Sequence, residues 1–180
     1  MHKMGEAVAR VARRVNDTVE NERDSLDLAD CKLVAFPVGI YKAVRSVAHG
    51  IRRVSLANNE LRALVGSFAA ALGQLRELNL EGNQLQRLPE ELRALQHLRA
   101  INLSRNRFRR FPEPLAALGA LETVELAHNE VAELPAELLV TMRSLRRLDL
   151  RGNPLRAPPA LAGPHAALEL LLSPEGGPDA

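Results

Sequence analysis

The sequence predicts an α/β solenoid, in which short strands stack into one parallel sheet and short helices or turns stack beside it. Five segments repeat around Asn59, Asn83, Asn106, Asn129 and Asn153, which lie 24, 23, 23 and 24 residues apart. Each asparagine follows two apolar residues that stand two positions apart, the spacing of one face of a strand. Most segments then continue with a proline and an apolar residue at helical spacing. Repeats of about 20–50 residues with this content indicate stacked coils.

The paired apolar residues define the predicted strands and the core. In the segment around Asn83 they are Leu78 and Leu80, and in the next segment they are Ile101 and Leu103. A spacing of two places both side chains on one face, so the pairs should stack from coil to coil. One coil cannot bury its own leucines, so three or more coils must stack before the array is stable.

The repeated asparagine is predicted to have a structural role. It lies where the chain turns away from the strand, and its amide can both donate and accept hydrogen bonds. A row of such side chains would satisfy the buried peptide groups of the turn. An earlier segment, DSLDLADCKL, carries cysteine at this position, so the structural set is Cys31, Asn59, Asn83, Asn106, Asn129 and Asn153. Because no second cysteine exists, an internal disulfide is excluded.

The second half of the repeat predicts a short helix. Proline occurs six residues after the cysteine or asparagine in four segments and, because its φ is fixed, suits the first turn of a helix. The inner face of each helix should carry the residue three positions later. The prolines are Pro37, Pro89, Pro112 and Pro135, followed by Ile40, Leu92, Leu115 and Leu138. The segment after Asn59 departs from this pattern, with Val65 in place of proline.

The repeats resemble a known family. Segments such as LRELNLEGNQL and LRAINLSRNRF follow the pattern L-x-x-L-x-L-x-x-N/C-x-L of leucine-rich repeats. The 23-residue version with Leu-Pro resembles the class found in ras-suppressor-type and scribble-type proteins. This resemblance implies a right-handed solenoid with a curved parallel sheet on the concave face and short helices or turns on the convex face. The resemblance supports the fold and the compartment more than a mechanism.

The two ends of the chain differ from the repeats. Residues 1–22 are predicted to form a capping helix, because valines and alanines recur at helical spacing from Val8 to Val19. The alternative is a basic amphipathic helix resting on a membrane. Residues 23–172 form the repeat domain, about six repeats and a degenerate closing turn with Ser173 at the asparagine place. Residues 173–180 are predicted to be a disordered tail.

Composition limits the class of protein. The chain has 180 residues, 46% of them apolar, and a net charge of +2, which is too small to indicate a nucleic-acid binder. Of its 24 basic residues only Lys3, Lys32 and Lys42 are lysine. No segment has the features of a secretory signal or a membrane span, so we expect a cytoplasmic protein. A monomer is favoured.

The predicted binding site is the open face of the sheet. The residues between and beside the core leucines point outward in columns, and exposed concave surfaces of solenoids are usual binding sites. The candidate partner-binding residues are Arg53, Asn79, Asn102, Arg105, Glu125, His128, Arg147, Asp149 and Arg151. We expect removal of Arg105 and Arg151 to weaken partner capture with little change in melting temperature.

Other functions have less support in the sequence. An enzyme is not expected, because no nucleophile–base arrangement, phosphate loop or metal-ligand spacing occurs, and no cofactor or metal is predicted. The alternative function is anion binding, to nucleic acid or phosphoinositide, through an arginine-rich surface without an aromatic stacking platform. Its residues would be Arg105, Arg107, Arg109, Arg110, Arg143, Arg146, Arg147, Arg151 and Arg156.

The predicted core has a direct test. Leu103→Ala should lower the free energy of unfolding by about 2–5 kcal/mol, because it leaves a cavity between neighbouring coils. Chemical denaturation would measure the loss, and a value under about 1 kcal/mol would contradict the stacked arrangement.

Overall fold

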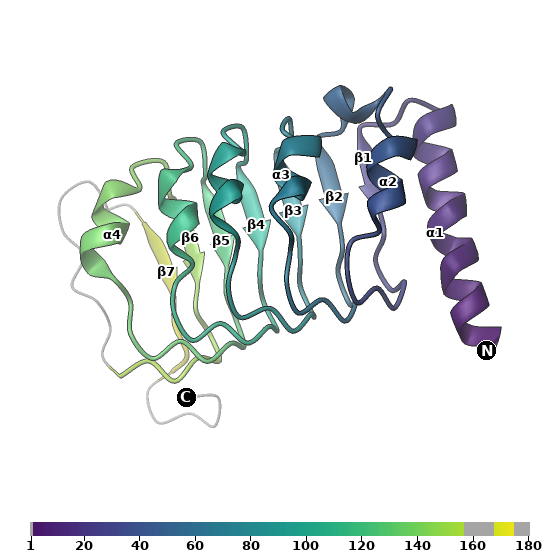
Figure 1. Ribbon diagram of the computed structural model, residues 1–180. Coiled ribbons are helices and arrows are strands. Elements are labelled where there is room, and N and C mark those ends of the chain that lie inside the picture. Colours follow the sequence, from purple (N-terminus) through teal and green to yellow (C-terminus); the bar gives the residue numbers. More distant parts are fainter. Residues whose placement is uncertain (1, 157–167, 175–180) are drawn as a thin grey trace.

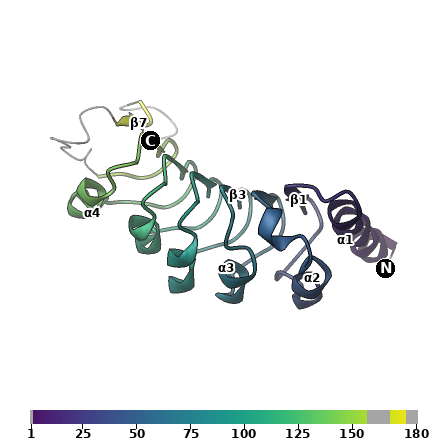
Figure 2. The ribbon, with the colours of Figure 1, turned by 90° about the horizontal axis from the view of Figure 1, so that it is seen from above.

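A computed structural model of the protein describes residues 2–156 and 168–174. The described residues form a seven-stranded parallel sheet in which the strands stand in chain order, from β1 to β7 (Figure 1). Seen from above, the strands line one side of the array and the short helices the other (Figure 2). The predicted solenoid, with a parallel sheet on one face and short helices on the opposite face, is confirmed.

Each coil contributes one three-residue strand and most contribute one short helix. The strands are β1 Ser25–Asp27, β2 Arg53–Ser55, β3 Glu77–Asn79, β4 Ala100–Asn102, β5 Thr123–Glu125, β6 Arg147–Asp149 and β7 Glu169–Leu171. The α-helices are α1 His2–Glu20, α2 Val38–Ala43, α3 Ser67–Ala71 and α4 Ala136–Thr141. The 3₁₀ helices are η1 Ala48–Gly50, η2 Glu90–Ala94 and η3 Glu113–Ala117.

The core is a single aliphatic stack between sheet and helices. Leu78, Ile101 and Val124 are direct partners on neighbouring strands, as predicted, and each exposes 2% of its surface or less. The buried cluster runs without a break from Val15 of α1 to Leu150 after β6. No coil has a core of its own, so the stability of each coil depends on its neighbours.

The repeated asparagines join each coil to the one before it. The Asn106 Nδ2 group donates to the carbonyl oxygens of Leu80 in the preceding coil and Leu103 in its own coil, at 2.9 and 3.1 Å. Its Oδ1 atom accepts the backbone N–H of Leu85 at 2.9 Å. The same three bonds, shifted by one coil, recur at the other four positions, Asn59, Asn83, Asn129 and Asn153. Each of these amides is more than 90% buried.

Cys31 occupies the asparagine position where no earlier coil exists. Its buried thiol donates to the Ala29 carbonyl oxygen of its own turn, at 3.3 Å. There is no preceding coil whose peptide groups need a bridging amide, which explains why cysteine suffices here. The neighbour is α1 instead, and its Arg14 guanidinium lies 3.7 Å from the Cys31 sulfur.

Helix α1 covers the open edge of β1 with hydrogen-bond donors. Thr18 and Arg14 donate to the carbonyl oxygens of Ser25 and Ala29, at 2.8 and 2.6 Å. Arg10 donates to the carbonyl oxygen of Asp30. The donors are four residues apart and so share one helix face. An open strand edge is a template for unwanted pairing. These contacts support the proposal of a capping helix rather than a membrane-binding one.

The length of a coil selects its helix type. The two coils of 23 residues, which end at Asn106 and Asn129, contain only the 3₁₀ helices η2 and η3, whereas the longer coils contain the α-helices α2, α3 and α4, with η1 following α2 in the longest coil. The prolines lie one residue before α2, η2, η3 and α4, at the N-cap position rather than in the first turn.

One predicted inner-face residue is wrong. Ile40, Leu92 and Leu115 are buried as expected, but Leu138 is half-buried, and Leu139 takes the buried place. The coil of α4 has one more residue than the coils of η2 and η3. The added residue lies between Pro135 and the buried leucine, so the fourth residue after proline, not the third, reaches the inner face.

The closing segment adds a strand. β7 pairs in parallel with β6, with Leu148 opposite Leu170, and Ser173 Oγ accepts the backbone N–H of Gly152 at 2.6 Å. The predicted tail at 173–180 lies outside the described residues from position 175 onward.

The asparagine row has its own test. Asn106→Ala removes a buried amide and leaves the peptide groups of Leu80, Leu85 and Leu103 without that partner. We expect a loss of at least about 1–3 kcal/mol in the free energy of unfolding, measured by urea denaturation. Gln86→Ala, at an exposed position three residues after Asn83, is the matched control and should change stability by less than about 0.5 kcal/mol. Equal losses in both variants would refute the bridging role.

Candidate functional site

The predicted partner-binding residues all lie on or directly after β2 to β6. The central column of the concave face consists of Asp27, Ser55, Asn79, Asn102, Glu125 and Asp149, which stand in register on neighbouring strands. Arg53 and Arg147 belong to the column at the start of each strand, and Arg105, His128 and Arg151 follow the strand ends. The array therefore brings Asn102, Glu125 and Asp149 onto consecutive strands.

Most of the central column already makes a structural contact. The Asn79 side-chain oxygen accepts the backbone N–H of Glu81, two residues on, at 3.0 Å, and Asn102 does the same for Ser104 at 3.0 Å. Asp27, Ser55 and Asp149 make the equivalent bond in their own coils. These are Asx- and Ser-type turns, which end each strand by giving its last peptide group a local acceptor.

Glu125 is the exception in this column. By analogy with the other coils, the Glu125 side chain should accept the backbone N–H of Ala127, two residues on. That N–H instead donates to Ser104 Oγ of the preceding coil at 3.1 Å. Within the described residues the Glu125 carboxylate makes no hydrogen bond or ion pair closer than 4 Å. It is half-buried on the open face, so its two oxygens remain available to another molecule.

The arginines of the concave face pair with carboxylates. Arg53 lies 3.3 Å from Asp24 and 3.9 Å from Glu77. Arg147 lies 3.1 Å from Glu169 of β7.

In the middle of the face, Glu81 has two partners. Its carboxylate accepts from Asn102 Nδ2 at 3.3 Å and lies 3.9 Å from Arg105. Such exposed pairs are worth about 0–1 kcal/mol, so the side chains can exchange partners at low cost.

Asp149 and Arg151 form a tighter pair. The guanidinium of Arg151 contacts both carboxylate oxygens, at 3.0 and 2.8 Å, and the Asp149 side chain is only 7% exposed. Burial raises the pKa of Asp149, but the hydrogen bonds from the Arg151 side chain and backbone and the charges of Arg151 and Arg147 outweigh it, so this pKa lies below its usual value. Asp149 is therefore a structural residue, and a partner can reach Arg151 but hardly Asp149.

Arg105 and His128 are held in an uncommon backbone conformation. The residues three positions after the central column, from Asp30 to Gly152, all have positive φ. Non-glycine residues there are uncommon. At Gly152 a Cβ atom would lie 2.4 Å from Nδ1 of His128, so the glycine both adopts the turn and makes room for the imidazole. Gly82 does the same for Asn58.

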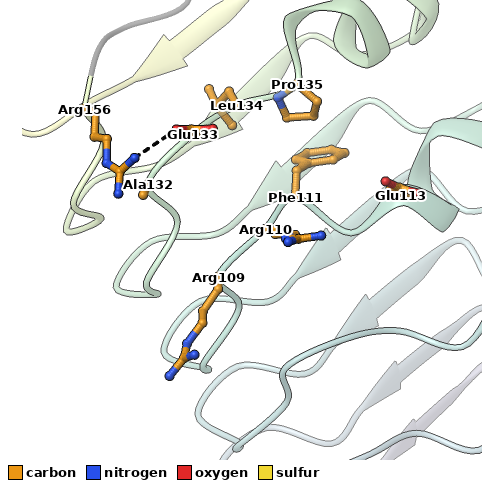
Figure 3. A pocket seen from close by; sticks show the side chains of 9 residues that line it. All are labelled: Arg109, Arg110, Phe111, Glu113, Ala132, Glu133, Leu134, Pro135 and Arg156. Carbon is orange, nitrogen blue, oxygen red and sulfur yellow. Dashed lines mark hydrogen bonds and ion pairs between the residues drawn. The ribbon is translucent and has the colours of Figure 1, made fainter.

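The arginines of the alternative anion site do not form one patch. Arg105, Arg147 and Arg151 lie on the concave face. Arg109 and Arg110 lie beyond the asparagine turn, beside a groove of about 360 Å³ where Arg156 turns toward Glu133 at 3.1 Å (Figure 3). Six of the nine pair with a carboxylate, and the other three are Arg107, Arg110 and Arg143.

Residues 2–156 and 168–174 contain neither a clustered set of metal ligands nor a helix that could span a membrane. No group of three or more His, Cys, Asp or Glu side chains in this part of the chain is placed to hold a metal ion. None of its helices combines the length and apolar content needed to cross a bilayer.

Two features of the site were missed by sequence reasoning. The turn-capping role of the central column could have been found, because Asp, Ser and Asn at one position of a repeat favour such turns. The burial of Asp149 could not have been predicted from the repeat pattern. It depends on β7, whose Leu171 stands opposite Asp149 in the sheet.

The chain is similar to known proteins over nearly its whole length. Family models described as leucine-rich repeat match residues 49–108 and 144–163. Leucine-rich repeat-containing protein 20 of Mus musculus is 62% identical over 176 residues, 97% of this chain and 96% of that protein. The Homo sapiens protein of the same name is 59% identical over 98% of this chain and 96% of that protein.

A solved structure shares the fold. The leucine-rich repeat domain of the type III effector XopL superimposes with a TM-score of 0.72 at 25% identity. The match covers 94% of this chain and 58% of that chain. The opening MGEAVARVARRVNDTVE and the stretch LQHLRAINLSRN resemble the mammalian proteins in particular, and the resemblance predicted from such stretches is confirmed.

The Asp149–Arg151 pair predicts a specific pH dependence. Because the pKa of Asp149 is lower in the folded state than in the unfolded chain, its stabilisation is present above about pH 4 and is lost as pH falls through the folded-state pKa. Arg151→Gln should lower the free energy of unfolding at pH 7 by more than removal of a fully exposed ion pair does, because it leaves the buried Asp149 carboxylate without its cationic partner. Urea denaturation at pH 7 and at about pH 3 should show this difference shrinking.

The matched control is Arg53→Gln, whose ion-pair partners are exposed, so its effect should stay below about 1 kcal/mol. A deficit in Arg151→Gln that does not change with pH would contradict the role given to Asp149. We therefore expect removal of Arg151 to lower the melting temperature, contrary to the expectation from the sequence. Removal of Arg105 is still expected to leave the melting temperature nearly unchanged.

Proposed function

The chain belongs to the leucine-rich-repeat family, and from this premise we propose that it is a non-catalytic interaction module that binds a protein partner on its concave face. The observation that carries the proposal is the free carboxylate of Glu125 in a column whose other members are committed to turns. A polar group that makes no internal bond at the centre of an open surface is available for intermolecular contact. Exposed concave surfaces are the usual binding sites of solenoids.

We place the centre of the contact around β4, β5 and the turns that follow them. Glu125 supplies an acceptor and Arg105, whose side chain is 63% exposed, supplies a planar donor. His128 is exposed beside them. Arg147 and Arg151 flank this centre with guanidinium groups that keep donors free beyond their pairs with Glu169 and Asp149. The remaining predicted contacts, Arg53 and Asn79, would lie at the rim.

The chemistry of this surface favours a polar partner of modest affinity. Arginine is a frequent anchor of protein interfaces, but tryptophan and tyrosine, the other frequent anchors, are absent from the concave columns. A partner with both a cation for Glu125 and carboxylates for Arg105 and Arg151 would complement the face.

A catalytic role has no support in the geometry. An enzyme site needs a concave pocket that excludes water around its reacting groups. Asp149, the neighbour of Glu125 in the column, is held by Arg151, so these two carboxylates do not form an acid–base pair. We therefore propose that the protein binds its partner without catalysing a reaction.

A cytoplasmic, monomeric protein is also part of the proposal. The buried free thiol of Cys31 suits a reducing compartment. Fluorescence microscopy of a tagged chain and light scattering of the purified protein test these two points. Anion binding by the nine predicted arginines is not proposed as a second function. Those residues lie on different parts of the surface, and six of them pair with carboxylates.

The concave face is tested by a double variant, Glu125→Ala with His128→Asn. Neither side chain makes a hydrogen bond within the described residues, and asparagine tolerates the positive φ of position 128. The melting temperature should therefore change little, whereas capture of the partner should fall about tenfold, the equivalent of about 1.4 kcal/mol. Quantitative affinity capture followed by titration of the purified partner would measure the loss.

The matched control is Gln86→Ala with Glu113→Ala, two exposed positions outside the strands and the columns of the concave face. It should retain every partner that the wild type captures. If the concave variant also retains them all, the proposed binding face is wrong.

A further inference from the structure

A row of arginines follows the edge of the sheet at which the strands begin. Each residue directly before a strand is linked to the next through the backbone: Arg76 N–H donates to the Arg52 carbonyl oxygen at 2.7 Å, and Arg99 N–H to that of Arg76 at 2.8 Å. The row continues with Glu122 and Arg146, again through bonds of 2.8 Å. We call Arg52, Arg76, Arg99, Glu122 and Arg146 the edge row; each member directly precedes one of the strands β2 to β6.

Three consecutive members of the edge row carry the same charge without an internal partner. Neighbouring strands are about 4.8 Å apart, so Arg52, Arg76 and Arg99 lie one above the other. Within the described part of the chain no carboxylate oxygen is within 4 Å of their guanidinium groups. The nearby acids are engaged elsewhere, Asp24 with Arg53 at 3.3 Å and Glu122 with Arg146 at 3.9 Å.

This arrangement opposes folding. Like charges directly opposite each other on neighbouring strands are destabilising. On the concave face the same chain pairs Arg53, Arg105, Arg147 and Arg151 with carboxylates, whereas three neighbouring arginines of the edge row have no such compensation within the described residues. An unfavourable local feature without internal compensation points to a functional surface.

The edge row ends beside a hollow that extends the positive surface. This hollow, of about 380 Å³, is lined by Arg99, Ala120, Glu122, Arg143, Ser144 and Arg146. Three cations and one carboxylate surround it, and Arg143 has no ion pair within the described residues. Beside the row, Gln74 and His97 are exposed and add neutral hydrogen-bonding groups.

We propose that the edge row binds an acidic segment of a protein partner, at a surface separate from the concave face. Guanidinium groups match carboxylates in a bidentate geometry. Carboxylates three or four residues apart on a helix lie about 5–6 Å apart, close to the spacing of the row, whereas same-side residues of an extended strand lie about 6.6 Å apart. An acidic helix therefore fits the row better than an extended chain.

Other anionic partners fit less well. No aromatic side chain belongs to the edge row or lines its hollow, so a nucleic acid would lack a stacking platform. The large apolar side chains exposed in the described residues are Val8, Val34, Val38, Val65 and Val140. None of them lies in the edge row, so a membrane surface would gain no apolar insertion from it.

The test titrates the full chain with a fluorescent helical peptide of about 18 residues that carries glutamate at every third or fourth position, followed by anisotropy. A peptide with glutamine in place of glutamate is the neutral control. We expect binding of the acidic peptide only, weakened severalfold when salt is raised from about 0.05 to 0.2 M. Arg76→Gln with Arg99→Gln should weaken binding at least tenfold while the variant melts no lower than the wild type, because like-charge repulsion is relieved.

A matched variant replaces two exposed arginines without ion pairs elsewhere, Arg62→Gln with Arg107→Gln, and should bind like the wild type. The concave-face variant, Glu125→Ala with His128→Asn, should also bind the acidic peptide normally, which separates this proposal from the preceding one. Equal loss in the Arg62/Arg107 variant would overturn the edge row as a site, as would tighter binding of a single-stranded RNA or of phosphoinositide vesicles than of the acidic peptide.

Discussion

The buried asparagine amide is the interaction on which the array depends. Each one donates to a carbonyl oxygen of its own coil and one of the preceding coil, and accepts a backbone N–H of that coil. A tight turn after a three-residue strand leaves these groups without partners in a dry interior, where an unmet hydrogen bond costs about 1–3 kcal/mol. Leucine packing makes the coils adhere, but the amide fixes their spacing and register. Cysteine takes the position at the first coil, which α1 rather than another coil precedes.

The same demand for internal partners determines which polar side chains are left for binding. Asn79, Asn102 and Asp149 lie on the open face, yet each caps the turn that ends its own strand. Glu125 does not cap its turn, because Ser104 Oγ of the preceding coil accepts the Ala127 N–H in its place. Polarity on an open surface is therefore a weak guide to function in a solenoid. The side chains without an internal partner are the better candidates.

Some arginines of this chain form internal ion pairs, and others keep an unpaired charge on the surface. On the concave face Arg53, Arg105 and Arg147 bridge neighbouring coils through carboxylates, and beyond the asparagine turns Arg156 does the same with Glu133. At the edge where the strands begin, Arg52, Arg76 and Arg99 have no such bridges to the residues that the structure describes. A formal net charge of +2 conceals this contrast, because paired and unpaired guanidinium groups count equally in a sum over the sequence.

The sequence by itself determined the coil count, the strand register, the buried leucines and the asparagine row, because these follow from a period that each repeat states locally. It also placed every concave residue in its column. Only the tertiary structure decided how those residues are used. Asp149 is buried because β7, across a separation of about 20 residues, stands beside β6, and Leu139 replaces Leu138 because one added residue lies between Pro135 and the buried leucine. Contacts between coils depend on side-chain reach and on neighbours distant in sequence, and a repeat pattern carries neither.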